Sequence, residues 1–280
     1  MIRLLTSMGS IQTVSMPRPG RRRFGVPPGG PFDSPAFRLA NALVGRDEES
    51  PGWELALASA TFIADADGFV ATTGAAATVT IASATAWNLV ATTNSVIRVC
   101  RGDQVSVGFP TSGCRVYVQW GSAGRVGRID YDLHFASPVG AIAGPDSSLF
   151  QTPWPAEFRL STLMNRVGIR AVADPSLIHA ESLPSKPQVV GSGQVTPAGE
   201  LIIIGPDGPV TGGYPQLLVV GSAWLPQVAQ WTPGQSIQIR PCSVEEARSE
   251  ALRREAILSD RIKEIRASLA TPVPRPRIGH

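Results

Sequence analysis

Two consecutive glycines beside a threonine, Thr211-Gly212-Gly213, separate two apolar runs in the C-terminal third of the chain. Asp207-Gly208-Pro209 before them is a turn signal. Tyr214-Pro215 after them restricts the exit, because the residue before a proline is disfavoured in the α region. Paired glycines permit positive φ or the close approach of another group. The segment is therefore either a long hairpin loop or a preorganised backbone cradle for a ligand.

Other common chemical motifs are missing from the sequence. No nucleophile elbow, P-loop, dinucleotide fingerprint or zinc motif occurs. The cysteines and histidines are three of each and scattered: Cys100, Cys114, Cys242, His134, His179 and His280. An odd, widely spaced set of cysteines indicates neither a disulfide framework nor a zinc site. We therefore expect no metal centre, and motif chemistry alone predicts no reaction.

The composition is that of a soluble, turn-rich domain. Of 280 residues, 43% are hydrophobic and 17% charged, with 28 glycines and 25 prolines. This balance favours a strand-rich fold. The net charge of +3 is carried almost wholly by arginine, with one basic cluster at Arg18–Phe24. That cluster can contact phosphate or form an exposed turn, and without a basic face with interleaved aromatics we expect no nucleic-acid partner.

Nothing in the sequence indicates a membrane or an export route. The N-terminus, Met1–Ser10, is too short and polar for a secretory signal. No run reaches the roughly 18 apolar residues of a membrane span. We therefore expect a cytoplasmic protein with reduced thiols.

Short apolar segments recur at a spacing of roughly 8–12 residues, which is typical of an all-β sandwich or barrel. The predicted strands are Ile2–Leu5, Ile11–Val14, Trp53–Leu57, Thr61–Ala64, Phe69–Thr72, Ala77–Ile81, Val96–Val99, Val105–Phe109, Arg115–Trp120, Phe158–Leu160, Val189–Gly191, Leu201–Ile204, Leu217–Val220 and Ile237–Ile239. We expect a first β subdomain over residues 1–142 and a second over 143–242. Residues 143–155 read as a linker between them.

Two helices interrupt this pattern. The first follows Asp33, with Ser34 as the expected N-cap, Pro35 at the first helical position and Gly45 at the C-cap. The second covers residues 243–270 and begins with the capping box Ser243-x-x-Glu246. Its apolar positions form a rough stripe: Ala247, Ala251, Ile257, Ile262 and Ile265. Residues 271–280 are expected to be a frayed tail.

Three stretches together resemble the biotin-dependent carboxyltransferase-like family, which includes allophanate hydrolase subunit 2, the KipI antagonist KipA and the C component of bacterial 5-oxoprolinase. Gly25–Glu54 reads Gly-Val-Pro-x-Gly-Gly-x-x-Asp, then Arg-Leu-Ala-Asn-x-Leu-Val-Gly, then a glutamate. Thr211–Pro215 matches the family's Thr-Gly-Gly-Tyr-Pro outright, and Asn165-Arg166-Val167-Gly168 follows its Asp-Arg-Met-Gly. The resemblance runs from about Met1 to Glu250.

The resemblance implies a mostly β fold of two cyclophilin-like β-barrel subdomains, with a short helix in the N-terminal half and a C-terminal helix. It implies a KipI-like partner (allophanate hydrolase subunit 1) and, in the 5-oxoprolinase branch, a further protein of the LamB/YcsF family. That assembly uses ATP to hydrolyse 5-oxoproline, a small cyclic amide with a carboxylate. This chain has no biotinyl-lysine motif, so we expect no biotin attached to it.

The resemblance also implies site residues. Asp33, Arg166 and Asp207 are the catalytic candidates. The substrate-binding candidates are Gly29, Gly30, Asn41, Glu54, Asn165, Thr211, Gly212, Gly213 and Tyr214. Asp33 can orient a donor or act as a base, Arg166 can clamp an anionic group, and the glycine N–H groups can stabilise developing negative charge.

Each candidate also has a purely structural interpretation. Asp33 can cap the helix that follows it. Glu54 can pair with Arg38, and Arg166 can brace a turn. Asn41 can satisfy a neighbouring loop.

Several positions depart from the family pattern. Gly208 and Pro209 replace an arginine and a glutamine, and neither can grip a carboxylate. Asn165 replaces an aspartate, and a Gly-Ser-Arg-Ser-Thr loop expected after Trp120 is missing. Two hypotheses therefore stay open: a component of an ATP-dependent amide hydrolase, or a non-catalytic KipA-like binding module that kept the fold.

Overall fold

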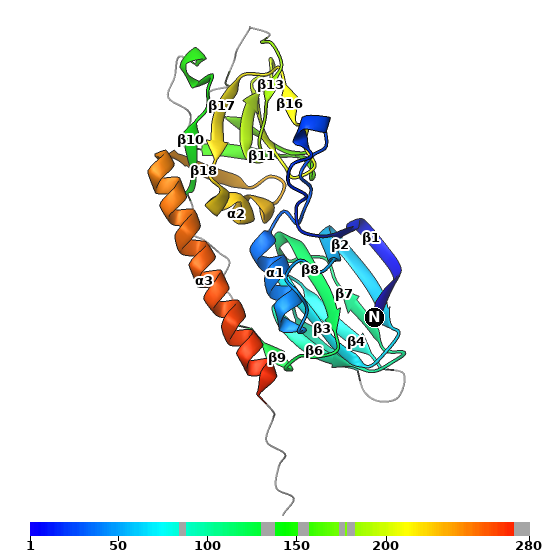
Figure 1. Cartoon of the computed structure of the whole chain (residues 1–280). Helices are drawn as coiled ribbons and strands as arrows, with labels where there is room; N and C mark the ends of the chain where they lie inside the picture. The colour runs from blue at the N-terminus through cyan, green and yellow to red at the C-terminus, as the bar shows by residue number, and fades with distance from the viewer. Residues whose placement is uncertain (84–87, 130–137, 151–156, 174–176, 178–182, 272–280) are drawn as a thin grey trace, which may run out of the picture.

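The computed structural model describes residues 1–83, 88–129, 138–150, 157–173, 177 and 183–271. Two β lobes lie one above the other, and a long helix runs along one side of both (Figure 1). In this part of the chain no helix is long and apolar enough to cross a membrane.

The first lobe is a curled nine-stranded sheet with one helix on it. Its elements are β1 (Ile2–Val14), α1 (Ser34–Leu43), β2 (Gly52–Ala64), β3 (Gly68–Ala76), β4 (Thr78–Ala82), β5 (Leu89–Thr92), β6 (Ser95–Val99), β7 (Gln104–Val107), β8 (Ser112–Gly121) and β9 (Gly127–Arg128). The strand order is β5-β4-β7-β2-β8-β3-β6-β9, with β1 added on β2.

The curl of this sheet is set on β2. Residues Trp53–Ala56 of β2 pair with β8, whereas Ala60–Ile63 pair with β7. Between these two stretches Leu57 has a φ of 45°, a region that residues other than glycine rarely enter. The irregularity lets one strand pass from one neighbour to the next, and α1 packs on β3 and β8 of the sheet.

The second lobe is a closed seven-stranded barrel in the order β10-β17-β14-β15-β12-β11-β18. Its elements are β10 (Val139–Ala143), β11 (Glu157–Met164), β12 (Gly168–Ala173), β14 (Ser192–Val195), β15 (Glu200–Ile204), β17 (Gln216–Val220), β18 (Ser236–Pro241), the small pair β13 (Lys186–Pro187) and β16 (Thr211–Gly212), and the short helix α2 (Leu225–Ala229). A parallel pairing of β10 with β18 closes the barrel. Buried branched side chains such as Ile169, Leu201 and Leu218 fill it.

The predicted mostly β, two-lobed fold with an early helix and a C-terminal helix is confirmed. Ile2–Leu5 and Ile11–Val14 belong to one strand, β1, and Trp53–Leu57 and Thr61–Ala64 to β2. The strand expected at Val189–Gly191 is wrong. The Ser192 N–H donates to the Val189 carbonyl at 3.0 Å and Gly191 has a φ of 91°, so a turn precedes β14.

The N-cap of α1 is Asp33, not Ser34. Asp33 Oδ1 accepts from the Ala36 N–H at 3.1 Å, while Ser34 is already helical. Gly45, just beyond the helix end, has a φ of 69°, which favours glycine over residues with a Cβ.

Helix α3 (Val244–Ala270) connects the two lobes, and its predicted Ser243 cap is confirmed. Ala247 packs into the second lobe, whereas Leu258, Ile262 and Ile265 pack on the first. Ile257, expected on the buried stripe, is 57% exposed, because the buried line passes through Leu258 instead.

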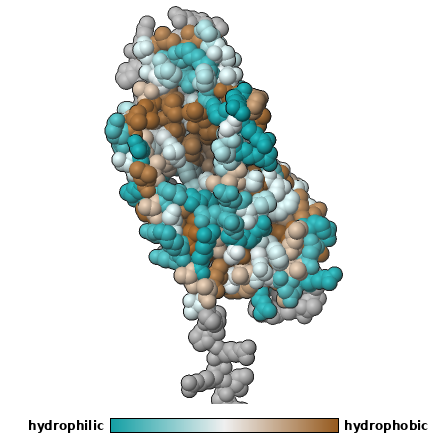
Figure 2. Space-filling model, in the orientation of Figure 1, coloured by the Kyte–Doolittle hydropathy of each residue, from teal (hydrophilic) through white to brown (hydrophobic). Residues whose placement is uncertain are grey.

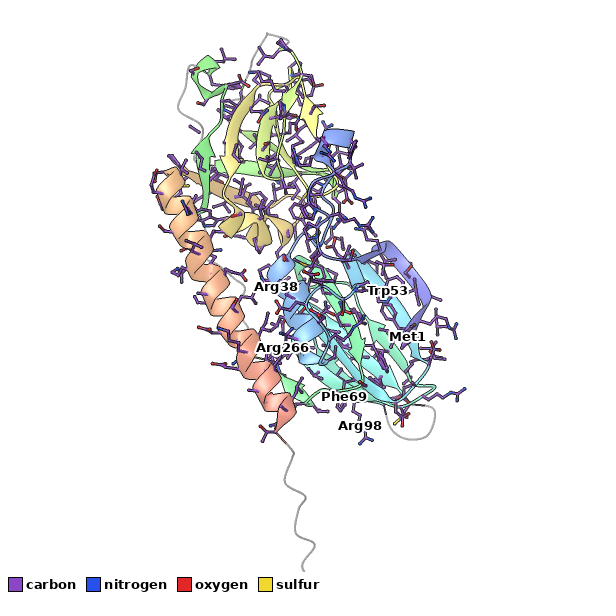
Figure 3. All side chains as sticks on the ribbon, viewed as in Figure 1. Met1, Arg38, Trp53, Phe69, Arg98 and Arg266 are labelled. Atoms are coloured by element: carbon purple, nitrogen blue, oxygen red, sulfur yellow. The ribbon has the colours of Figure 1, made fainter. Side chains whose placement is uncertain are left out.

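Between these attachment points, Arg38 of α1 makes a two-bond fork to Glu255 of α3, each bond 2.8 Å long. Figure 3 shows Arg38 on the side of α1 that faces α3.

Part of the predicted linker (151–155) and of the predicted frayed tail (272–280) lie outside the described residues, as do all three histidines.

Candidate functional site: the junction between the two lobes

A cleft of about 1320 Å³ lies where the two lobes and α3 meet. Its walls come from the loop before α1, from the segment β17–α2 and from α3, and they include Gly29, Phe32, Val220, Leu225, Ala251 and Leu258. Figure 2 shows brown, apolar surface on the second lobe beside this hollow. A mostly apolar concavity next to a few polar groups is typical of a ligand-binding site.

Arg166 joins the two lobes. It lies in the turn between β11 and β12 and donates from Nε and Nη2 to the two carboxylate oxygens of Asp207, at 2.7 and 2.9 Å. Its Nη1 donates to Glu54 Oε1 at 2.8 Å, and Nη2 also donates to the Gly30 carbonyl at 2.7 Å. Four of the five guanidinium N–H groups are thus engaged: two by Asp207 within the second lobe, and two across the junction by Glu54 and Gly30. We call these four residues the Arg166 clamp.

Glu54 is the first lobe's part of the clamp, and its carboxylate is 1% exposed. It lies opposite Tyr117 in the β2–β8 ladder. Its Oε2 accepts from the Tyr117 hydroxyl at 2.8 Å and from the Phe32 N–H at 3.1 Å. It pairs with Arg166 and not with Arg38, whose partners are Glu48 and Glu255. Burial raises the pKa of Tyr117 well above its ordinary value, so the phenol stays a donor to Glu54.

Asp33 is fully buried between α1 and the second lobe. Besides capping α1, its Oδ2 accepts from Gln230 Nε2 at 2.7 Å. Burial raises the pKa of Asp33 to about 6, against the hydrogen bonds from Gln230 and Ala36, which lower it. The Asp33 carboxyl therefore caps α1 and also has a raised pKa.

Arg115 fills the space between these groups. Its guanidinium lies 4.6 Å from the centre of the Phe32 ring and 3.6 Å from Glu54. It also donates to the Ala229 carbonyl of α2. The junction thus holds three acids and two arginines, and all of them except Asp207 are buried. Buried charges are tolerated only when they are paired.

The Thr211–Tyr214 segment is not part of the Arg166 clamp. Thr211–Gly212 pairs with Lys186–Pro187 in the β13–β16 sheet. A Cβ on Gly212 would lie 1.6 Å from the Gln188 amide nitrogen and 2.8 Å from that of Gln194. Position 212 therefore needs a glycine because the two glutamine amides pack closely against it. A positive φ is not the reason, since Gly212 does not have one.

The two predicted asparagines satisfy neighbouring backbone. Asn41 Nδ2 donates to the carbonyls of Glu48 and Ser50, at 3.1 and 2.9 Å, and so holds the loop after α1. Asn165 Oδ1 accepts from the Val167 and Gly168 N–H groups, at 2.8 and 3.2 Å. That turn presents Arg166.

The Gly29 N–H donates to the Pro206 carbonyl at 3.0 Å, beside Asp207.

The junction therefore brings together Asp33, Glu54, Arg166, Asp207 and the Gly29–Gly30 turn. Sequence reasoning missed Arg115, Tyr117 and Gln230 as members of this cluster. The sequence could have indicated two of them, because Arg115 and Tyr117 alternate with valines along one predicted strand. Such a pattern places polar side chains on a single face. In the described residues no group of three or more His, Cys, Asp or Glu side chains could hold a metal ion.

The structure explains why Gly208 replaces the arginine of the family pattern. Gly208 is buried in the turn after β15, and a Cβ there would lie 2.5 Å from Ile204 Cγ2 and 2.6 Å from the Val167 carbonyl oxygen. The arginine of the family pattern does not fit on this backbone. Pro209, the second departure, is exposed.

We predict that Arg166→Ala lowers the free energy of unfolding by about 3 kcal/mol. Glu54 stays buried and loses its hydrogen-bonded cation, and the cation that is left to it is Arg115 at 3.6 Å. Arg170→Ala is the matched control on the neighbouring strand. Arg170 and its partner Glu200 are both partly exposed, so the expected loss is below about 1 kcal/mol. Urea unfolding of both variants measures the difference, and equal losses would contradict the clamp.

The raised pKa of Asp33 predicts a pH dependence of stability. Its value rises from 3.8 to about 6, so the folded state binds the proton more tightly than the unfolded state. The stability of the wild type relative to Asp33→Asn should therefore fall as pH rises from about 4 to about 6, by up to about 3 kcal/mol. Urea unfolding at several pH values checks this. A difference that stays constant with pH would refute it.

Restoring the family's arginine should harm the fold. We expect Gly208→Arg to lower the free energy of unfolding by about 1–3 kcal/mol or more, because its Cβ meets backbone. Pro209→Gln restores the other family residue at an exposed position and should change it by less than about 1 kcal/mol. Thermal melting compares the two, and a Gly208→Arg variant as stable as the wild type would show that this turn adapts.

Comparison with known proteins places this geometry in a family. A family model for the carboxyltransferase domain, subdomains A and B, matches residues 24–127 and 128–241. The C component of the 5-oxoprolinase of Escherichia coli K12 is 27% identical over 282 residues, which cover 82% of this chain and 87% of the relative.

Urea amidolyases match over a small part of their own length. That of Saccharomyces cerevisiae is 28% identical and covers 83% of this chain but 16% of the relative. The crystal structure of the K. lactis urea amidolyase matches with a TM-score of 0.78 at 25% identity, over 94% of this chain and 20% of that one. Since the family model spans most of the sequence, this chain belongs to the family of carboxyltransferase domains with subdomains A and B.

Proposed function

We propose that this chain is a component of a multi-chain amide hydrolase of the 5-oxoprolinase or allophanate hydrolase type. The observation that carries the proposal is the match to the C component of 5-oxoprolinase over 87% of that relative's length. The urea amidolyases instead contain such a unit as about a sixth of a longer chain. The match therefore covers most of the 5-oxoprolinase component but a small share of a urea amidolyase, which supports the first of the two as the better counterpart.

The geometry supports a component better than a complete enzyme. Arg166 is bonded to Glu54, Asp33 is bonded to Gln230 and to the backbone of α1, and the two acids are almost wholly buried. A general base must reach the proton that it removes, and these groups do not face solvent. The cleft beside them is open to a second chain or a small ligand.

In this proposal the substrate is a small cyclic amide with a carboxylate, such as 5-oxoproline. The assembly adds water across the amide bond to give glutamate, and it uses ATP to drive the step. A KipI-like chain and a protein of the LamB/YcsF family complete the assembly. Biotin has no attachment motif here, since the chain has only Lys186 and Lys263.

A second candidate is a non-catalytic, KipA-like binding module. Two observations favour it. The donors of Arg166 are taken up by Asp207, Glu54 and Gly30, and the backbone at Gly208 excludes the arginine of the family pattern. Such a chain would keep the partner surface without contributing to chemistry.

Co-expression distinguishes the two candidates. The chain is produced with its KipI-like and LamB/YcsF-like partners, and ADP release is followed with and without 5-oxoproline. The same mixture lacking this chain is the control. We expect ADP release that depends on 5-oxoproline and is lost in the control.

The other outcomes are equally specific. A stable complex without turnover would overturn the hydrolase proposal in favour of the binding module. If no complex forms, the partner assignment is wrong.

A further inference from the structure

An arginine-rich loop near the N-terminus takes no part in the Arg166 clamp. We call Arg18–Pro28 the basic loop, and its ends are joined by the bond from the Arg18 N–H to the Pro28 carbonyl, at 3.0 Å. It holds four arginines: Arg18, Arg21, Arg22 and Arg23. No acidic residue occurs anywhere from residue 17 to residue 32.

These cations are not neutralised within the described part of the chain. The clamp arginine pairs with Asp207 and Glu54, whereas no ion pair involves the four loop arginines among the described residues. The guanidinium of Arg23 lies 4.7 Å from the centre of the Phe24 ring. Arg18, Arg21 and Arg23 are exposed, and Arg22 is half-buried.

Apolar side chains lie beside the charges. Phe24 is 69% exposed and Val26 is 43% exposed. An aromatic residue next to arginines is the composition enriched at protein–protein contacts. Nucleic-acid binding instead calls for a broad basic face, and the net charge of the whole chain is only +3.

The loop is held next to the cleft. Its flanking and terminal residues Pro17, Pro28 and Gly29 line that cleft. Gly29 also bonds to Pro206 in the second lobe, and several prolines stiffen the excursion. Figure 1 shows the loop, in dark blue, rising from the first lobe towards the second. A chain bound to it would therefore lie against the cleft.

We propose that the basic loop docks an acidic surface of the partner protein chain, with Phe24 entering an apolar pocket at the centre of that contact. This rests on the proposed function, which supplies a partner chain. Complementary charges steer such a partner during encounter, and the exposed aromatic ring slows its release. The loop would then hold the partner over the cleft between the lobes.

The test measures the Kd of this chain for the KipI-like chain by surface-based kinetics. In the variant R21Q/R22Q/R23Q we expect a Kd at least about tenfold weaker, mainly through slower association. The ratio of the variant's Kd to the wild-type Kd should fall as salt rises from about 50 mM to about 300 mM, because exposed charges are screened. Phe24→Ala should instead speed dissociation.

A matched control removes the same charge elsewhere. Arg98, Arg101 and Arg128 are exposed on the first lobe and, in the described part of the chain, make no ion pair. Figure 3 places Arg98 at the end of that lobe away from the second. We expect R98Q/R101Q/R128Q to change the Kd less than about twofold.

The outcomes separate this inference from the proposed function. If the wild type binds and both triple variants bind equally well, the docking site is wrong while the partner stands. If the wild type does not bind the KipI-like chain, the partner is wrong and the docking proposal is overturned with it. If R21Q/R22Q/R23Q keeps the wild-type Kd for the partner but loses binding of ATP or inorganic phosphate, the loop is a phosphate site instead.

Discussion

The position of one lobe relative to the other depends on the buried ion pair between Arg166 and Glu54. Arg166 comes from a tight turn of the barrel, and Glu54 comes from the strand at which the first sheet bends. A charge buried to this degree is stable only with its partner in place. The pair therefore couples the two lobes, with Arg115 of the first lobe also 3.6 Å from Glu54, and α3 reinforces the arrangement by packing on both.

The same interaction limits what this chain can do by itself. The residue types that suggested acid–base chemistry are present and close together, but they are used to hold the junction. The pKa of Asp33 is still raised, because burial raises it by more than the two accepted hydrogen bonds lower it. The open space lies beside these groups, in the cleft. A role as part of a larger assembly follows naturally from a rigid junction next to an open, mostly apolar cleft.

Local sequence signals predicted local structure well. The Ser243 cap, the strands at Leu201–Ile204 and Leu217–Val220 and the early helix each depend on a few adjacent residues. Strands such as Ser192–Val195 could not be found this way. That segment has little apolar character, and its strand conformation comes from ladder bonds to β15 and β17.

The candidate site was less predictable, for a physical reason. Asp33 and Gln230 are bonded although they are 197 residues apart, and Glu54 and Arg166 are 112 apart. No spacing rule reaches so far along a chain. The family resemblance named Arg166 and Asp207 as two separate candidates, and the structure joins them by hydrogen bonds of 2.7 and 2.9 Å. It did not reveal that Gly212 is a glycine because two glutamine amides pack against it.

A double-mutant cycle between Arg166 and Glu54 tests the central claim most directly. The free energies of unfolding of Arg166→Ala, Glu54→Gln and the double variant are compared with that of the wild type. We predict a coupling energy of about 2 kcal/mol or more, because the pair is buried and shares a hydrogen bond of 2.8 Å. A coupling energy near zero would show that the two side chains act independently, and the clamp would not be what holds the lobes together.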